Sequence, residues 1–393
     1  MLRRRAAIDW YIGRIVPGLP PSPRKRVLAA LALVEGWRPD VIDGACDGDR
    51  FRPDRLDKVE RFLIETLAGK MLEHPEMPQP VRCNYPEWLD GALTRLFGAR
   101  IGEEMAAMNG SAPLDLRVNQ LKSNRLDARK ALAAEGVEAV PTDLAPTGLR
   151  VYERIPLSTL EVFKSGRIEV QDEGSQLAAL LAQVKPGMRV VDFCAGAGGK
   201  TLAIAAQMQN KGHLVACDIS AKRLERSGTR LRRAGISNVE RRTLSTERDK
   251  WVKRHAGSFD RVFVDAPCTG TGTWRRNPDA KWRLEPKDLQ ELTELQARIL
   301  DSAARLAKPG GRVIYATCSL LPEENDRQIE AFLASHPDFA LVPVGEVWRE
   351  AFGKDCPEPG EMLHLTPARN GTDGFFVAVM ARTAAAPEAA DAA

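Results

Sequence analysis

The sequence lacks the features of a membrane protein or a disulfide-rich protein. No apolar run approaches the roughly 18 residues that a membrane helix needs. The basic start, Met1 to Arg5, is not closely followed by the apolar stretch of a signal peptide. There is no CxxC pair, and the odd number of cysteines in 393 residues fits neither a disulfide framework nor a zinc site. We therefore expect a cytoplasmic protein with no membrane partner and no metal, in which any special cysteine acts as a free thiol.

The chain also lacks a strong charge of either sign, because 57 basic and 53 acidic residues leave a net charge of only +4. That total does not identify a nucleic-acid partner, so local clusters matter more. Basic residues outnumber acidic ones over 222–254, although a solvated helix face explains this cluster equally well. The stretch 274–283 mixes cations with aromatic rings, which suits phosphates and unstacked bases better than an ordinary surface loop. From it we predict RNA contacts for Arg275, Arg276, Lys281 and Trp282.

Composition and periodicity divide the chain into four parts. Residues 1–80 are predicted to be helical, with a Pro-rich linker at their end. Residues 81–162 are predicted to form a small α+β RNA-binding unit, and 163–382 a larger α/β domain. The low-complexity tail, 383–393, is predicted to be disordered. Elements expected before the large domain are helices over 24–35, 56–72 and 125–135 and a strand over 114–121.

From about residue 165 onward, strand-like and helix-like segments alternate. Such alternation predicts a mainly parallel sheet covered by helices on both faces. The expected strands are 189–193, 214–218, 238–244, 259–265, 312–316 and 375–380. The expected helices are 201–209, 221–234 and 286–307.

A glycine-rich loop follows the first of these strands. Residues 190–201 run from a strand through three glycines into a helix, and a helix N-terminus offers free N–H groups to an anionic group. A glycine loop alone serves a dinucleotide equally well. Asp218, at the end of the next strand, is placed to hold two ribose hydroxyls, as in both nicotinamide and S-adenosylmethionine sites. A competing role for Asp218 is the N-cap of the following helix, for which Ser220 is a second candidate.

Two cysteines follow two further strands. Cys268 comes three residues after Asp265, and Cys318 ends the strand after the long helix. A strand–helix–strand unit places both carboxyl ends at the same edge of the sheet, so both thiols should meet there. Single cysteines are commonly just buried, and that is our interpretation of Cys46, Cys83 and Cys356.

Paired thiols beside an aspartate suit methylation of cytosine at carbon 5. That carbon is a poor nucleophile until a thiolate adds to carbon 6. The reaction also requires a hydrogen-bond donor or acid near nitrogen 3 and help with the final elimination. Cys318, Asp265 and Cys268 are the candidates for these roles, and the cytosine must be single-stranded or flipped out.

These residues and their neighbours resemble the Sun/Nop-type RNA cytosine-5 methyltransferases, over about residues 81 to 382. The matching pieces are 116–119, 170–176, 192–201, 265–272, 276–278, 281–282, 295–300, 317–319, 322–325 and 372–376. The resemblance implies a class I, Rossmann-like methyltransferase domain with S-adenosylmethionine as cofactor. It also implies that Cys318 is the nucleophile, Cys268 assists product release, Asp265 contacts the base and Asp218 holds the ribose. In DNA cytosine methyltransferases, by contrast, the cysteine of the Pro-Cys motif is the nucleophile.

The cofactor-binding residues expected from this resemblance are those of the glycine loop and the two aspartates: Cys194, Ala195, Gly196, Ala197, Gly198, Gly199, Lys200, Asp218 and Asp265. The sequence departs from the family pattern at two points. Gly196-Ala197 stands where Ala-Pro is usual, and Ser245 stands where an aspartate is usual, with Glu247 nearby. We expect ribosomal RNA as substrate and a monomer. Alternatives are a tRNA substrate, a non-catalytic RNA-binding assembly factor on the same fold and, more remotely, a nicotinamide oxidoreductase.

Overall fold

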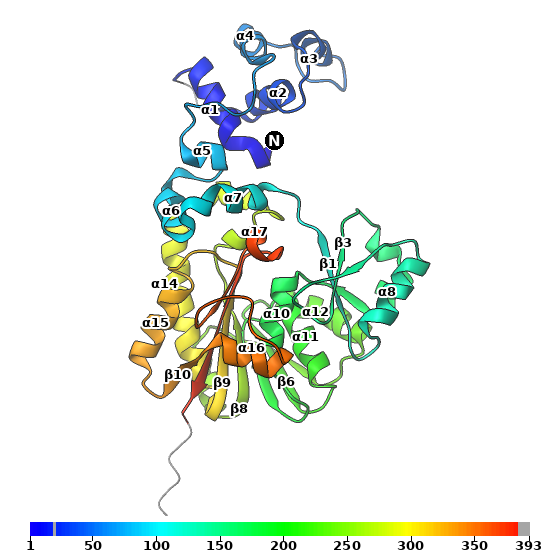
Figure 1. The fold of residues 1–393 in the computed structure, drawn as a ribbon, viewed down its shortest axis with the longest axis vertical. Helices are drawn as coiled ribbons and strands as arrows, with labels where there is room; N and C mark the ends of the chain where they lie inside the picture. Colours follow the sequence, from blue (N-terminus) through cyan, green and yellow to red (C-terminus); the bar gives the residue numbers. More distant parts are fainter. Residues whose placement is uncertain (19–20, 384–393) are drawn as a thin grey trace, which may run out of the picture. The chain divides into compact units, whose positions relative to one another are not determined.

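The computed structural model describes residues 1–18 and 21–383, so 384–393 of the predicted tail lie outside the described residues. Two compact units divide the chain (Figure 1). Unit 1 comprises Met1–Ser111 together with Trp274–Leu284, and unit 2 comprises Ala112–Thr273 and the chain from Glu285 onward. The chain therefore leaves unit 2 for eleven residues and returns to it. These two compact units do not correspond one to one to the four predicted domains, so the predicted domain boundaries remain predictions.

Unit 1 is helical. Its helices up to residue 67 pack around one apolar core that includes Ile8, Ile12, Leu63 and Ile64, all buried. The predicted helix over 56–72 is shorter in the structure, because Gly69 adopts a left-handed φ of 71° just after it ends. The helices are α1 (Arg5–Ile15), α2 (Pro23–Leu33), α3 (Pro39–Ala45), α4 (Lys58–Leu67), α5 (Gln79–Cys83), α6 (Asp90–Phe97) and α7 (Ile101–Asn109).

Unit 2 begins with a small antiparallel sheet in the order β2-β3-β1-β4. The strands are β1 (Leu114–Val118), β2 (Val140–Pro141), β3 (Gly148–Val151) and β4 (Ile168–Val170), and the helices α8 (Arg125–Ala134) and α9 (Glu161–Lys164) accompany them. The predicted strand over 114–121 ends early, since the Asn119 side chain accepts a hydrogen bond from the Leu121 N–H and turns the chain. This sheet and its helices bury a core of their own.

The larger sheet of unit 2 has the order β10-β12-β9-β8-β5-β6-β7, with β11 paired to β12. The five strands β9, β8, β5, β6 and β7 are parallel to one another, while β10, β11 and β12 run antiparallel to their neighbours. The strands are β5 (Arg189–Asp192), β6 (His213–Asp218), β7 (Val239–Thr243), β8 (Phe259–Asp265), β9 (Ala307–Thr317), β10 (Phe339–Val342), β11 (Leu363–Leu365) and β12 (Phe375–Arg382). The predicted mainly parallel sheet is confirmed.

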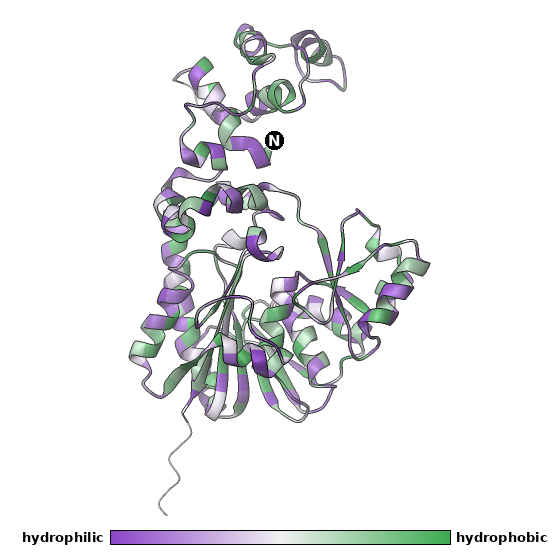
Figure 2. Ribbon diagram, viewed as in Figure 1, coloured by the Kyte–Doolittle hydropathy of each residue, from purple (hydrophilic) through white to green (hydrophobic). Residues whose placement is uncertain are grey.

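Helices cover both faces of this sheet, because its central strands are apolar on both sides. Val262 and Val264 of β8 join one core cluster with α14 (Pro286–Ala304) and α15 (Asp326–Ser335). Phe263, between them, joins the opposite cluster with α10 (Glu173–Leu180), α11 (Gly199–Gln207) and α16 (Val344–Phe352). Figure 2 shows these central strands in the hydrophobic colours. The remaining helices are α12 (Ala221–Ala234), α13 (Lys250–Arg254) and α17 (Pro367–Asn370).

Two predicted bounds differ from the structure for a local reason. The strand expected over 312–316 begins at Ala307, which pairs with Phe259 of β8; the register then shifts so that Arg312 is opposite Arg261, and residues 308–311 bulge out between these two pairs. The preceding helix therefore ends at Ala304 instead of 307. Both changes lie at the edge of the sheet opposite the strand ends described next.

Candidate active site

Four chemically active side chains lie at or just beyond the carboxyl ends of adjacent parallel strands. Asp192 ends β5, Asp218 ends β6 and Asp265 ends β8, while Cys318 follows β9 directly. Asp265 is opposite Ala316 in the register of β8 and β9. Carboxyl ends at this edge are where open α/β sheets bind their ligands. The structure thus gathers the predicted catalytic and cofactor-binding residues within unit 2.

The glycine loop between β5 and α11 is held by Asp218. One oxygen of its carboxylate accepts from the Gly196 N–H at 2.8 Å, and the other accepts from the Ser220 N–H at 2.7 Å. The Ser220 hydroxyl caps α12, so the structure assigns the N-cap to Ser220 and leaves Asp218 at the loop. Gly198 has a φ of 81°, and a Cβ there would lie 2.9 Å from the Cβ of Ser227. Only glycine fits at that position without strain.

The loop residues fit a zwitterionic cofactor. Helix α11 has Gly198 as its N-cap and no side-chain cap, so the N–H groups of its first turn are available to a carboxylate. Asp192 is wholly buried, and its Oδ2 accepts from the Thr201 hydroxyl at 2.7 Å. Its Oδ1 has no partner among the described hydrogen bonds. S-adenosylmethionine carries a carboxylate, which suits the free N–H groups of α11, and two cationic groups, which suit the carboxylates.

Burial changes the acidity of Asp192. Loss of solvation raises its pKa to about 7, although the Thr201 hydroxyl opposes that rise. Burial and the surrounding carboxylates likewise raise the pKa of Cys194 well above its ordinary value. Cys194 is therefore a neutral thiol inside the loop, and its contribution to a cofactor site comes through the shape of the backbone.

Lys200 and Asp265 form an ion pair in which the lysine is largely buried and the aspartate is partly exposed. The Lys200 Nζ donates to Asp265 Oδ2 at 2.8 Å, and 10% of the lysine side chain is exposed. Burial by itself lowers the pKa of Lys200, but the attraction of Asp265 outweighs it and the net pKa is raised. A charged donor and a charged acceptor are therefore fixed side by side at the sheet edge. Lys200 was predicted from the cofactor loop alone, and its pairing with Asp265 was not.

The two cysteines meet as the topology predicts. The Cys268 and Cys318 sulfur atoms lie 3.5 Å apart, and both residues are half-buried. The contact with Cys318, burial and the nearby charge of Glu324 together raise the pKa of the Cys268 thiol well above its ordinary value. Cys268 is therefore held as a neutral S–H group beside its partner.

Two residues that support this pair, Glu324 and Gln296, were not predicted as site residues. Glu324 is fully buried, and its carboxylate accepts from the N–H of Thr269, the residue after Cys268, at 2.8 Å. Gln296 donates both to Glu324 and to the carbonyl of Pro267, the residue before Cys268, each at 2.9 Å. Both residues lie inside motifs of the family resemblance. A sequence motif does not give the hydrogen-bond partners of its polar residues.

The structure also shows the surroundings of Ser245, which stands after β7 where the family usually has an aspartate. Glu247 forms an ion pair with Arg298 at 3.2 Å. Ser245 instead donates through its N–H and its hydroxyl to Asp249, at 2.9 and 2.8 Å. Those bonds, with one from the Trp251 N–H, lower the pKa of Asp249 to about 2. The carboxylate beside Ser245 is therefore Asp249, four residues later than the family pattern places it.

The four residues predicted to contact RNA belong to unit 1. Lys281 is buried, and its Nζ donates to the Asn84 carbonyl at 2.9 Å and to Asn109 Oδ1 at 2.6 Å. The Trp282 ring N–H donates to the Leu2 carbonyl at 3.3 Å. Arg275 is also buried, whereas Trp282 and Arg276 are partly exposed. The structure thus places Lys281 within the packing of unit 1.

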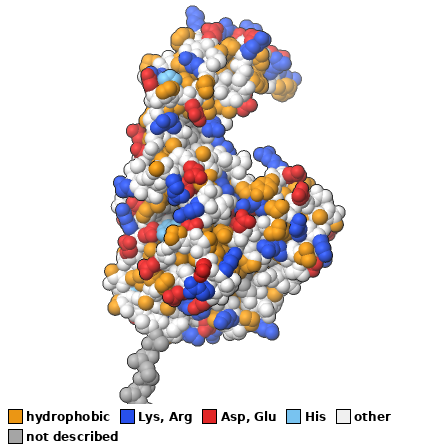
Figure 3. Space-filling model, in the orientation of Figure 1, with side chains coloured by type: hydrophobic (Ala, Val, Ile, Leu, Met, Phe, Trp, Pro, Cys, Tyr) orange, Lys and Arg blue, Asp and Glu red, His pale blue; other side chains and the backbone are white. Residues whose placement is uncertain are grey.

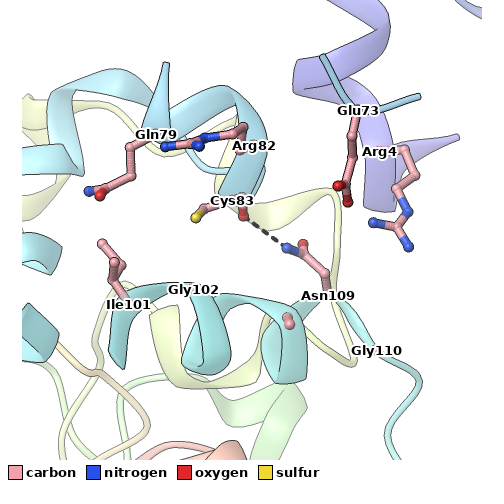
Figure 4. Close-up of a pocket in the computed structure, with 10 residues that line it drawn as sticks. Arg4, Glu73, Gln79, Arg82, Cys83, Ile101, Gly102, Asn109 and Gly110 are labelled. Atoms are coloured by element: carbon pink, nitrogen blue, oxygen red, sulfur yellow. Dashed lines mark hydrogen bonds between the residues drawn. The ribbon is translucent and has the colours of Figure 1, made fainter. Parts of the chain in front are cut away.

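Unit 1 also has a cavity of about 450 Å³ between α5 and α7. Figure 4 shows Arg82 and Gln79 of α5 on one side and Ile101 and Asn109 of α7 on the other, with the Asn109 amide donating to the Cys83 carbonyl. Its lining mixes cations with an acid and holds no pair of groups suited to acid–base chemistry.

The described residues contain neither a membrane-spanning helix nor a metal-binding cluster. None of the helices described has the length and apolar character that crossing a bilayer demands. No group of three or more His, Cys, Asp or Glu side chains within 1–18 and 21–383 is arranged to hold a metal ion. Over the face seen in Figure 3, basic and acidic side chains are interspersed.

Comparison with known proteins agrees with this geometry. A family model described as 16S rRNA methyltransferase RsmB/F matches residues 178–381, and one described as a ferredoxin-like domain of RsmF/B-like methyltransferases matches residues 85–158. The chain is 36% identical to ribosomal RNA small subunit methyltransferase B of Pasteurella multocida, over 85% of this chain and 72% of that protein. It is 32% identical to the protein of the same name from Photorhabdus laumondii, over 96% and 87% of the two chains.

A solved structure of a methyltransferase homologue from Pyrococcus horikoshii is also similar. It has a TM-score of 0.66 and 29% identity, and the match covers 79% of this chain and all of that one. The predicted Rossmann-like methyltransferase fold, the Sun/Nop-type family and S-adenosylmethionine as methyl donor are confirmed. The chain therefore belongs to the RsmB/F family of 16S rRNA methyltransferases, and its predicted activity, cytosine-5 methylation of RNA, is the activity of that family.

Proposed function

We propose that this chain methylates carbon 5 of a cytosine in small-subunit ribosomal RNA, with Cys318 as the nucleophile and Cys268 as the group that assists release. The observation that carries the proposal is the 3.5 Å contact between the two sulfur atoms at the strand ends that also hold Asp265 and Asp218. A single buried thiol has no use there, whereas two thiols at one ligand-binding edge suit a covalent mechanism.

In this reaction the Cys318 thiolate adds to carbon 6 of the cytosine and forms a carbon–sulfur bond. The electron pair moves to carbon 5, which becomes enamine-like and takes the methyl group that S-adenosylmethionine supplies when bound. Water, acting as the base, then takes the proton from carbon 5, which restores the double bond between carbons 5 and 6 and expels the Cys318 sulfur as a thiolate. Cys268 lies beside that sulfur and is placed to assist the expulsion.

Lys200 and Asp265 are placed to bind the cytosine ring. Adding a thiolate to carbon 6 pushes charge toward nitrogen 3 and the carbonyl oxygen, so a donor is required there. The Lys200 ammonium supplies such a donor, and Asp265 keeps it charged and oriented through the 2.8 Å contact. We assign base recognition to this pair: Lys200 donates to the ring, and Asp265 contacts the ring by accepting from its amino group.

The contacts of Cys268 make it the less suitable attacking group of the two. A nucleophile must be available as thiolate, and the pKa of Cys268 is raised well above its ordinary value by its contact with Cys318, by burial and by Glu324. Cys268 is therefore poorly suited to attack and well suited to remain a thiol during the first step. This division is the opposite of that in the DNA cytosine enzymes.

The substrate is proposed to be ribosomal RNA, and the enzyme to act in the cytoplasm as a monomer. The names of the relatives refer to the small ribosomal subunit, and the partly exposed Arg276 and Trp282 are proposed to contact the RNA. Because a cysteine must reach carbon 6, the target cytosine is unstacked when it reacts.

The test uses S-adenosylmethionine with a labelled methyl group. The chain is incubated separately with unmodified 16S ribosomal RNA, with small subunits that lack the modification and with unmodified tRNA, and the nucleosides are then identified by mass spectrometry. We expect label in 5-methylcytosine from ribosomal RNA. Label only in tRNA would show that tRNA, and not ribosomal RNA, is the substrate. No 5-methylcytosine in any of the three would refute the proposed reaction.

A further inference from the structure

The loop that carries Cys268 is fixed by one buried carboxylate. Glu324 lies in the turn between β9 and α15 and has no exposed surface. Its two oxygens accept from three donors: the Thr269 N–H at 2.8 Å, the Gln296 amide at 2.9 Å and the Thr269 hydroxyl. The ion pairs of the described residues include none to Glu324, so neutral donors alone stabilise this carboxylate.

These bonds hold Cys268 from both sides along the chain. Glu324 binds the residue after it, Thr269, through both the backbone and the side chain. Gln296 of α14, itself bound to Glu324, donates to the carbonyl of Pro267 at 2.9 Å. The peptide groups on either side of Cys268 are thus bound to one carboxylate–amide pair.

Glu324 is also bound to β9, the strand that directly precedes Cys318. Its backbone carbonyl accepts from the Tyr315 hydroxyl at 2.8 Å, and Tyr315 is part of β9. The next residue, Asn325, accepts from the Thr317 hydroxyl at 2.6 Å and donates to the Ser319 carbonyl at 2.9 Å. The same short turn therefore connects the Cys268 loop to the residues that flank Cys318.

We propose that Glu324, through Gln296 and Thr269, is a positioning residue that sets the distance between the Cys268 and Cys318 sulfur atoms and thereby controls release of the methylated RNA. The inference rests on the proposed role of Cys268. Burying a carboxylate without a cation costs free energy of folding. We attribute the retention of Glu324 despite this cost to its role in positioning Cys268. A group that only stabilised the fold would affect methyl transfer and release alike.

The experiment compares full-length variants with 16S ribosomal RNA and S-adenosylmethionine. Glu324→Ala removes all three hydrogen bonds, and Glu324→Gln keeps an acceptor for the Thr269 N–H and a donor for its hydroxyl. Glu323→Gln is the matched control, since Glu323 pairs instead with Arg327 at 3.1 Å. Cys268→Ala is the reference for blocked release. Single-turnover methyl transfer, steady-state turnover and the RNA–protein adduct on a denaturing gel are measured for each.

We expect Glu324→Ala to keep single-turnover methyl transfer but to accumulate the adduct, with turnover lowered by up to about 10²-fold, the scale of a 1 Å misplacement. Glu324→Gln should restore turnover to within about threefold of the native chain, because it replaces the bonds that position the loop. The control should behave as the native chain does. Should Glu324→Ala not fold, Gln296→Leu takes its place with the same expected adduct, since it removes the bonds to the Pro267 carbonyl and to Glu324 and leaves the bonds between Glu324 and Thr269.

The outcomes separate this inference from the proposed function. If Cys268→Ala traps the adduct while Glu324→Ala and Gln296→Leu turn over freely, the positioning role is wrong and the proposed function stands. If Glu324→Gln traps as much adduct as Glu324→Ala, the charge and not the placement matters, and the inference is overturned. If Cys268→Ala traps nothing, both the role of Cys268 and this inference fail.

Discussion

Asp192 is an acid held entirely out of solvent at the end of β5, with its pKa raised to about 7. Between about pH 4 and 7 the folded chain therefore keeps a proton that the unfolded chain has lost. Because the folded state binds more protons in this window, the free energy of unfolding falls as pH rises, by at most about 1.4 kcal/mol per pH unit.

Asp192→Asn should remove that part of the pH dependence while keeping the bond from the Thr201 hydroxyl. Urea unfolding at a series of pH values from 4 to 8 measures it, with the exposed Asp143→Asn as control. A slope for Asp192→Asn that matched the native chain would show that Asp192 is ionised throughout.

The acids and thiols of the site were predictable because each follows a strand that the sequence marks clearly. Asp265 and Cys268 come after an apolar run, and β8 and β9 are neighbours, as a strand–helix–strand unit requires. Glu324 and Asp249 were not predictable in their roles. Glu324 lies in a turn and Asp249 is the N-cap of α13, and their partners, Thr269 and Ser245, are set by loop conformation that no periodicity encodes.

At the level of the elements, the strand ends are joined by a close approach of two glycines. Gly272 follows the Cys268 loop, and its N–H donates to the Cys318 carbonyl at 2.9 Å. Its carbonyl accepts from the Gly374 N–H at 2.8 Å, just before β12. A Cβ on Gly272 would lie 2.2 Å from the Gly374 carbonyl oxygen. The contact thus leaves no room for a side chain between the end of β9 and the start of β12.

Gly272→Ala should therefore lower the free energy of unfolding by about 1–3 kcal/mol, the usual cost of overpacking, and should reduce methyl transfer by moving the Cys318 backbone. Thermal unfolding and a methylation assay measure the two effects. Gly345→Ala, in α16 with nothing near its Cβ position, is the control and should be neutral or slightly stabilising. Equal effects of the two substitutions would contradict the close-packed contact.

Element types were predictable for the large sheet, and element ends were less so. The central strands are apolar on both faces, which gives a strong signal. The start of β9 was missed because residues 308–311 bulge between the pairs Ala307–Phe259 and Arg312–Arg261, and no periodicity in the sequence marks a strand interrupted in this way. The early end of β1 depends on one side-chain bond of Asn119. Such boundaries are set by tertiary contacts.

For the whole molecule, the chain's eleven-residue excursion from unit 2 into unit 1 is the main feature that sequence patterns did not predict. Its Lys281 was expected at an RNA surface and is instead buried, because the Asn84 carbonyl and the Asn109 side chain accept from its Nζ. Burial, with a smaller effect of Arg3, lowers the pKa of Lys281 to about 7. A sequence motif of cations and aromatic residues does not distinguish an RNA-binding lysine from a buried structural lysine.

This lysine predicts a pH dependence of opposite sign to that of Asp192. Between about pH 7 and 10.5 the unfolded chain binds the proton that folded Lys281 has lost, so the free energy of unfolding rises with pH, by at most about 1.4 kcal/mol per unit. Lys281→Met should abolish that rise. Urea unfolding followed by tryptophan fluorescence from pH 7 to 9.5 tests it, with the exposed Lys70→Met as control. An unchanged rise in Lys281→Met would show that Lys281 stays charged in the folded state.

The central claim is the division of labour between the two cysteines. The most direct test is to mix Cys318→Ala and Cys268→Ala separately with 16S ribosomal RNA and S-adenosylmethionine and to separate the products on a denaturing gel. We predict that Cys318→Ala gives neither adduct nor methylated cytosine, while Cys268→Ala gives a covalent adduct whose cytosine is already methylated. An adduct formed by Cys318→Ala, together with loss of methyl transfer in Cys268→Ala, would contradict the account.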